Sequence, residues 1–179
     1  MRLRGLGVAL ALAAAGGCAT TASDARDPLE GVNRAVYAFN EQADEIVFKP
    51  AARLYRNLAP DALREMVRNF FNNLDDLYIG ANNLLQGKLE DAVNDWGRFA
   101  FNTVFGVLGV WDIASDMGLE KHNEDFGQTL AHWGAGDGPY LVLPLLGPST
   151  LRDTVALPVD WEGDPVTMHR PVDESNTML

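Results

Sequence analysis

Residues 60–85 carry the longest uninterrupted helical pattern of the chain, and this pattern constrains the fold most. Apolar side chains recur every three or four residues, namely Leu63, Met66, Val67, Phe70, Leu74, Leu77, Ala81 and Leu84. This spacing is typical of an amphipathic α-helix, which would extend about 39 Å over this segment. Pro60 suits the start of such a helix and Gly87 suits the position after its end. The pattern predicts an all-α fold built around one long helix.

Helical spacing also marks the segments on either side. Asp27-Pro28-Leu29-Glu30 is typical of a helix start with Asp27 as N-cap, and the helix that follows is expected to stop at Lys49-Pro50. Pro50 can open a short helix that ends near Asn57. Further helices are expected over residues 88–104, 111–117, 124–133 and 149–157. The apolar run from Tyr140 to Leu146 is interrupted by Pro144, and residues 161–179 are predicted to form a poorly ordered tail.

The first residues are typical of a secretory leader rather than of the fold. Arg2 and Arg4 precede an apolar stretch from Gly5 to Gly17 that is too short to span a bilayer. The stretch ends at Cys18, the single cysteine of the chain, in a context similar to a lipobox. We therefore expect residues 1–17 to be a signal peptide and residues 18–26 a tether that is acylated at Cys18. Ala19 in place of an aspartate favours sorting to the outer membrane of a Gram-negative cell.

Charge and motifs exclude several classes of function. The formal net charge of −11 disfavours nucleic acid as a partner, because phosphate neutralisation needs a surplus of Lys and Arg. No nucleotide loop or serine-hydrolase elbow is present, and no cofactor or metal is expected. His122, Glu124, Asp125 and His132 come nearest to a catalytic set. We interpret them as structural, with Asp125 capping a helix, and predict that the chain is not an enzyme.

The asparagines of the helices and two apolar segments each allow two interpretations. Asparagines are frequent in the third and fourth expected helices, at Asn69, Asn72, Asn73, Asn82, Asn83, Asn94 and Asn102. They either pack and cap helices or form an uncharged polar surface that meets lipid headgroups or lines a wet channel. The apolar segments 99–111 and 140–146 are either core or an interfacial surface, the latter with Trp96 and Trp111 near headgroup level.

Several sequence blocks resemble the MlaA (VacJ) family of outer-membrane lipoproteins. They occur in family order, at residues 27–34 (DPLEGVNR), 69–74 (NFFNNL), 83–88 (NLLQGK), 98–99 with 102–103, 124–130 (EDFGQTL), 132–134 (HWG), 138–148 and 152–153. The resemblance covers about residues 27–160, which we take as the helical domain.

The resemblance implies a ring-like helical body embedded in the inner leaflet of the outer membrane and facing the periplasm. An amphipathic channel would take mislocalised phospholipids from the outer leaflet and pass them to a soluble periplasmic carrier. A trimeric porin is the other implied partner. We expect Leu141, Leu143 and Leu146 to contact acyl chains, and assign Asn83 and Phe99 to the same lipid path. The alternative from another class is a structural lipoprotein that tethers partners at the outer membrane.

The family continues beyond its Arg152-Asp153 block with further helices, whereas residues 161–179 here do not align with them. The resemblance therefore leads us to expect a ring with an open side and an unusually large exposed apolar surface.

Overall fold

The computed structural model describes residues 28–165. In chain order the elements are α2 (Glu30–Ala43), the π-helical turn η1 (Asp44–Phe48), α3 (Lys49–Leu58), α4 (Asp61–Leu85), α5 (Leu89–Val104), α6 (Ile113–Asp116), α7 (Phe126–His132), β1 (Tyr140–Leu143), β2 (Gly147–Thr150) and α8 (Leu151–Gly163). The chain is mostly helical, so the predicted fold class is confirmed. The signal peptide, Cys18, the tether and most of the expected tail lie outside the described residues.

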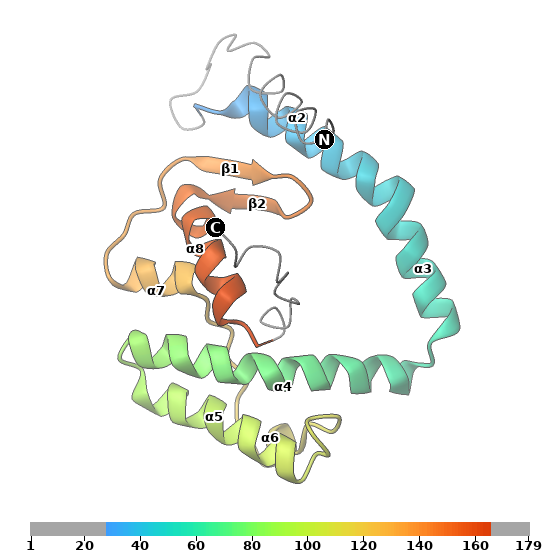
Figure 1. Cartoon of the computed structure of the whole chain (residues 1–179), viewed down its shortest axis with the longest axis vertical. Coiled ribbons are helices and arrows are strands. Elements are labelled where there is room, and N and C mark those ends of the chain that lie inside the picture. The colour runs from blue at the N-terminus through green and yellow to red at the C-terminus, as the bar shows by residue number, and fades with distance from the viewer. Residues whose placement is uncertain (1–27, 166–179) are drawn as a thin grey trace, which may run out of the picture.

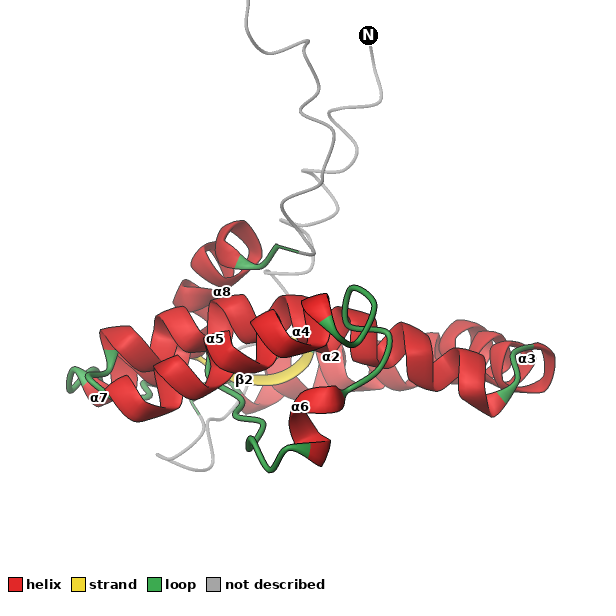
Figure 2. Ribbon diagram, turned by 90° about the horizontal axis from the view of Figure 1, so that it is seen from below, coloured by secondary structure: helices red, strands yellow, loops and turns green. Residues whose placement is uncertain are grey.

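The elements are arranged as a flat ring. In Figure 1, α2, α3 and α4 form three sides, and α7, α8 and the β1–β2 hairpin occupy the fourth. α4 contacts α7, α7 packs on α8, α8 contacts β2, and β1 contacts α2. This circuit closes within residues 28–165, so the open side that we expected is not found between these elements. Seen edge-on in Figure 2, α2 to α5 lie in one shallow layer, with α8 and α6 on opposite sides.

The long central helix pairs with α5 in the largest helix–helix contact of the described chain. The boundaries of both helices agree closely with the expected ones. Gly87 joins them with a φ of 78°, a left-handed conformation that glycine adopts without steric cost. Gly80 allows close approach, because a Cβ there would lie 2.5 Å from the indole nitrogen of Trp96.

The start of the first helix and its junction with the next one differ in part from the expectation. The first helix begins at Glu30, with Leu29 at the cap position, and Asp27, the expected N-cap, lies outside the described residues. α2 ends at Ala43 and η1 leads directly into α3, so no break separates the two at Lys49-Pro50. The short helix expected at Pro50 is confirmed, because α3 has Pro50 in its first turn and ends at Leu58. The wider π-turn separates backbone groups that the proline ring would otherwise crowd.

α8 runs through Pro158 to Gly163, so the first residues of the expected tail are helical. The tyrosine hydroxyl of Tyr78 on α4 donates to Asp160 Oδ1 at 2.8 Å, and Gly163 lies directly against the Tyr78 ring. This tertiary packing outweighs the local cost of the proline.

The apolar run at Tyr140 forms the first strand of a hairpin, which the sequence did not predict. β1 and β2 are antiparallel, with Tyr140 opposite Thr150 and Leu143 opposite Gly147. Pro144 falls in the turn, where Leu145 has a φ of 65°, and Gly147, the first residue of β2, has a φ of 88°. The hairpin therefore places the leucines of this segment beside α2.

Candidate functional site

The distribution of polar and apolar side chains is inverted relative to a water-soluble domain. The largest fully buried side chains of the described residues are all polar: Asn73, Asp76, Asn82, Asn83, Asp95 and Thr129. The buried apolar side chains there are Ile79, Ala92, Ala114, Val142 and Ala156, three of which are alanines. Large apolar residues are exposed on every side of the ring, for example Ile46, Leu58, Val104 and Leu108. Since exposed apolar surface costs about 25 cal/mol per Å² in water, this exterior suits hydrocarbon better than water.

The buried faces of α4 and α5 are themselves polar stripes. On α4 the stripe contains Asn73, Asp76 and Asn83, and on α5 it contains Asp95 and Arg98. Their spacing of three to seven residues places each set on one helix face. The helix-packing interpretation of the asparagines is confirmed for Asn73 and Asn83, whereas Asp76, Asp95 and Arg98 were not predicted to join them, although they share the same spacing. The two helices therefore join through hydrogen bonds and ion pairs.

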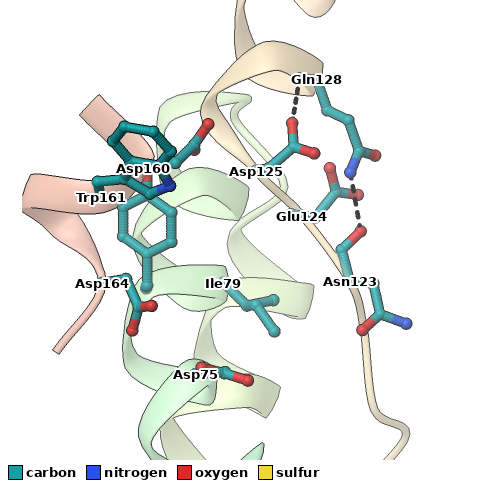
Figure 3. A pocket seen from close by; sticks show the side chains of 10 residues that line it. Asp75, Ile79, Asn123, Glu124, Asp125, Gln128, Asp160, Trp161 and Asp164 are labelled. Carbon is teal, nitrogen blue, oxygen red and sulfur yellow. Dashed lines mark hydrogen bonds between the residues drawn. The ribbon is translucent and has the colours of Figure 1, made fainter. Parts of the chain in front are cut away.

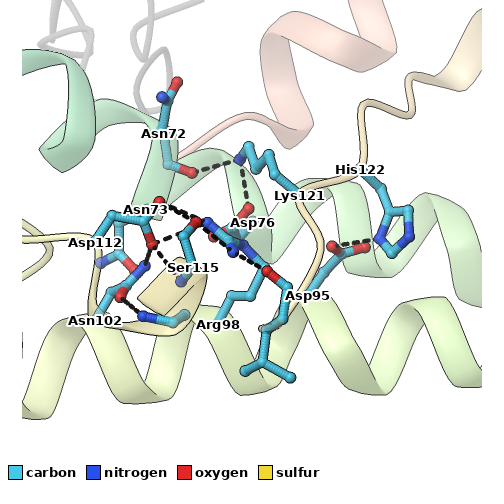
Figure 4. Close-up of polar contacts among 12 residues, drawn as sticks. Asn72, Asn73, Asp76, Asp95, Arg98, Asn102, Asp112, Ser115, Lys121 and His122 are labelled. Atoms are coloured by element: carbon cyan, nitrogen blue, oxygen red, sulfur yellow. Dashed lines mark hydrogen bonds and ion pairs between the residues drawn. The ribbon is translucent and has the colours of Figure 1, made fainter. Parts of the chain in front are cut away.

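Arg98 is the centre of this buried polar network (Figure 4), and its side chain is 3% exposed. Its guanidinium donates to both carboxylate oxygens of Asp112, at 3.0 and 3.1 Å, and to the Leu119 carbonyl at 2.6 Å. Asp76 lies 3.5 Å away on the other side and also pairs with Lys121. Arg98 thus fastens the loop after α5 to the α4–α5 pair.

The pKa values of two carboxyl groups in the network are shifted in opposite directions. Burial alone would raise the pKa of Asp112, but hydrogen bonds from Ser115 and Asn102 and the charge of Arg98 lower it to about 2. Burial raises the pKa of Asp76 despite its contacts with Lys121 and Arg98. Asp112 therefore holds its negative charge more firmly than Asp76 does.

Two asparagines of α2 close the ring by binding the hairpin backbone. Asn33 donates to the Tyr140 carbonyl at 3.1 Å and accepts from the Val142 amide at 2.9 Å. Two turns further along, Asn40 donates to the Leu143 carbonyl at 2.9 Å and accepts from the Leu145 amide at 2.7 Å. Each side-chain amide thus binds two backbone groups of the hairpin.

The leucines assigned to the lipid path lie on this hairpin. Leu141 and Leu143 are half-buried, while Leu146 is 56% exposed. Leu146 lines a pocket of about 330 Å³ between the hairpin turn and the end of α2, together with Asn40 and Phe48. An apolar wall beside an amide group is therefore present at this junction.

The other two assigned residues lie elsewhere in the ring. Asn83 on α4 is fully buried and donates to Asp95 Oδ2 at 2.7 Å. Phe99 on α5 is half-buried. Neither α4 nor α5 is among the main contacts of the hairpin. The structure brings Leu141, Leu143 and Leu146 together but does not place Asn83 or Phe99 beside them.

The residues that come nearest to a catalytic set each make structural contacts. Asp125 caps α7, as expected, by accepting from the Gln128 amide at 2.6 Å. His122 contacts Asp95 at 2.9 Å, and Glu124 accepts from Lys88 and Gln86. Among residues 28–165, no group of three or more acidic, histidine or cysteine side chains is placed to hold a metal ion.

A second pocket of about 280 Å³ lies between α4, α8 and the segment before α7 (Figure 3). Acidic side chains dominate its lining, including Asp75, Asp160 and Asp164, with Ile79 and Trp161 as apolar partners. Burial raises the pKa of Asp75, which Lys121 opposes.

The loop after α5 exposes a further apolar surface. Phe105, Val107, Leu108 and Trp111 all project from it, and Val107 and Leu108 have positive φ angles of 52° and 58°. Left-handed backbone is unfavourable for a β-branched valine, so the loop holds its apolar side chains outward at a conformational cost.

In the part of the chain that is described, no helix has the length and apolarity to cross a bilayer.

Comparisons with known proteins agree on one family. A family model described as MlaA lipoprotein matches residues 25–179. Proteins named intermembrane phospholipid transport system lipoprotein MlaA, from Escherichia coli K12 and Shigella flexneri, are each 36% identical over 160 residues, which cover 86% of this chain and 64% of theirs. An uncharacterized protein of Rickettsia prowazekii is 40% identical over 127 residues, covering 71% of this chain and 51% of its own.

A solved structure from work on the structural basis for maintenance of bacterial outer membrane lipid asymmetry has the same fold. It matches with a TM-score of 0.67 and 33% identity, over 85% of this chain and 75% of that one. The chain spans 51% of the Rickettsia relative and 64% of the two named ones, so it represents about half to two thirds of their length.

Proposed function

The chain belongs to the MlaA lipoprotein family, and on that basis we propose that it removes phospholipids from the outer membrane and passes them to a soluble periplasmic carrier. The substrate is a phospholipid, and the direction is from the outer leaflet toward the cell interior. The chemistry is transfer without covalent change, so no catalytic residue and no cofactor takes part.

The inverted burial pattern carries this proposal. A ring whose exterior is apolar and whose helices join through polar contacts can lie among acyl chains without losing its internal hydrogen bonds. A body of this kind gives a two-tailed amphiphile both apolar and uncharged polar surface to move along. The lipid-transport names of the relatives and the lipid-asymmetry work on the similar structure support the same function.

The hairpin is the proposed part of the lipid path. Leu141, Leu143 and Leu146 would contact acyl chains, next to the amide of Asn40. Phe99 and Asn83 would lie on the same path at the α4–α5 side of the ring. Asn83 would act there by orienting Asp95, to which it is bonded.

Acylation at Cys18 is the proposed means of attachment. The chain would be cleaved before this residue and acylated on it at the periplasmic face of the outer membrane. Each buried methylene group of an acyl chain contributes about 0.8 kcal/mol to membrane binding, and a single chain gives only marginal attachment. Several acyl chains and the apolar exterior would therefore act together. Unmodified Cys18 in the mature protein of a Gram-negative host would contradict this assignment.

Mass spectrometry of lipid bound to the purified acylated protein tests the function. We expect phospholipid in roughly equimolar amount, and we expect its release to a soluble lipid carrier. A trimeric porin is the proposed membrane partner and should co-purify in mild detergent. Protein that carries no phospholipid would instead support a structural lipoprotein that tethers partners.

A further inference from the structure

α3 is the helix that the rest of the described chain leaves uncovered. Every residue from Lys49 to Leu58 is exposed, and its main contact is with η1, the turn that precedes it. In Figure 1 it forms one side of the ring, away from the α7, α8 and hairpin side. α3 continues the helical segment that begins at Glu30, but its side chains gain no packing from the rest of the described chain, which leaves them accessible to a surface outside residues 28–165.

The sequence of α3 has two opposite faces. Lys49, Arg53 and Arg56 follow each other at spacings of four and three residues, which places all three on one face. Leu54 and Leu58 are also four residues apart and lie on the opposite face. A short helix with a basic face and an apolar face is typical of segments that lie in a membrane interface.

Within residues 28–165, two of the three cations form no ion pair with an acidic side chain. Lys49 is paired with Asp44 at 3.0 Å, which raises its pKa. On the neighbouring α4, Arg64 pairs with Asp61 and Arg68 with Glu65. Among the ion pairs of residues 28–165, none involves Arg53 or Arg56. These two guanidinium groups are therefore available to an anion.

We propose that α3 docks on a bilayer surface that contains acidic phospholipid, with Arg53 and Arg56 on the headgroup phosphates and Leu54 and Leu58 among the acyl chains. A guanidinium offers two parallel donors that match phosphate oxygens. The net charge of −11 does not oppose this contact, because charges farther than about 8 Å are screened at physiological ionic strength. The inference rests on the proposed membrane location and adds a headgroup class to it.

Partition onto vesicles tests the proposal in the chain that begins at residue 18 and carries Cys18→Ser, so that neither the expected leader nor an acyl chain contributes. The probes are vesicles of phosphatidylglycerol with phosphatidylethanolamine and vesicles of phosphatidylcholine alone. At about 0.15 M ionic strength, where the remote negative charges are screened, Arg53→Gln with Arg56→Gln should weaken partition onto the acidic vesicles roughly thirtyfold. Partition onto the phosphatidylcholine vesicles should change less than twofold. Circular dichroism should show unchanged helix, since both side chains are exposed.

Arg64→Gln with Arg68→Gln is the matched control, because it removes the same charge from cations that are already paired. This control should weaken partition several-fold less than the α3 pair does. Equal losses for the two pairs, or no loss for the α3 pair, would overturn the proposal, the latter favouring an acidic protein as occupant. Leu54→Gln with Leu58→Gln should weaken partition onto both kinds of vesicle, and no effect would also overturn it. Lipid carried by the acylated chain is measured separately, so failure here leaves the proposed function standing.

Discussion

Replacing Asn33 with alanine tests how the ring is closed. The substitution removes two hydrogen bonds between α2 and β1, those with the Tyr140 carbonyl and the Val142 amide. The Val142 amide is buried, so it would be left without water as a substitute partner. A lost hydrogen bond costs about 1 kcal/mol, and a buried unpaired donor about 1–3 kcal/mol. We expect Asn33→Ala to lower the free energy of unfolding by about 3 kcal/mol.

Asn40→Ala is the informative comparison, because it also removes two bonds to the hairpin. The Leu145 amide that it frees is exposed and can bind water, so the expected loss is only about 1 kcal/mol. Asn57→Ala on the exposed α3 should change stability by less than about 0.5 kcal/mol.

Denaturant unfolding in detergent and hydrogen exchange of the hairpin amides provide the two measurements. Asn33→Ala should speed exchange at Val142 far more than Asn40→Ala does at Leu145, since a difference of about 1.4 kcal/mol is about tenfold. Equal effects of the two substitutions, or exchange at Val142 unchanged by Asn33→Ala, would refute the reasoning.

Three further predictions follow from single side chains. Arg98→Met leaves Asp112 and Asp76 without their buried cation and should destabilise the protein by about 3–5 kcal/mol in denaturant unfolding, whereas a loss below about 1 kcal/mol would show that the network is dispensable. Leu143→Asp should reduce the phospholipid that co-purifies while circular dichroism stays helical, and outright unfolding would mean that Leu143 is ordinary core. The pKa of Asp112 is about 2 in the folded state, against an ordinary value of 3.8, so its contribution to stability is complete above about pH 4 and is lost as the pH falls toward 2. Asp112→Asn should therefore flatten the acid side of a curve of stability against pH. An unchanged curve on that side would contradict the assignment.

The two central helices could be predicted because their signals are local. Residues 60–85 were expected to be helical, and α4 spans Asp61–Leu85. Gly87 ends the pattern in the sequence and has the left-handed conformation that such an end requires. Periodicity and a cap residue lie within one segment, so no tertiary information is needed to recognise them.

The hairpin could not be predicted in this way. Its strands have four residues each, too few to establish a period, and Pro144 argues against a strand. Its free edge is satisfied by Asn33, which precedes Tyr140 by 107 residues. Only the folded ring brings these groups together, and a single sequence does not contain that pairing.

The sequence alone also could not predict which face of each helix is buried. A helical stripe identifies a face but not the solvent that the face meets, so the apolar positions of α4 fit a core as well as a bilayer. The asparagines were the useful signal, since Asn73, Asn82 and Asn83 are buried and hydrogen-bonded. Arg98 was missed as the centre of the network, although it shares a helix face with Asp95 and Asn102.

Quenching of tryptophan fluorescence by phospholipids with brominated acyl chains tests most directly whether the apolar exterior lies in the membrane. The acylated protein is reconstituted into such vesicles and compared with its Trp111→Phe variant, because Trp111 is 50% exposed on the apolar loop after α5. A membrane-embedded exterior predicts that brominated lipid quenches the emission and that the quenched fraction falls in Trp111→Phe, while the fraction that aqueous iodide quenches does not fall in this variant. Emission from Trp111 that iodide quenches and brominated lipid does not would contradict a membrane-embedded exterior.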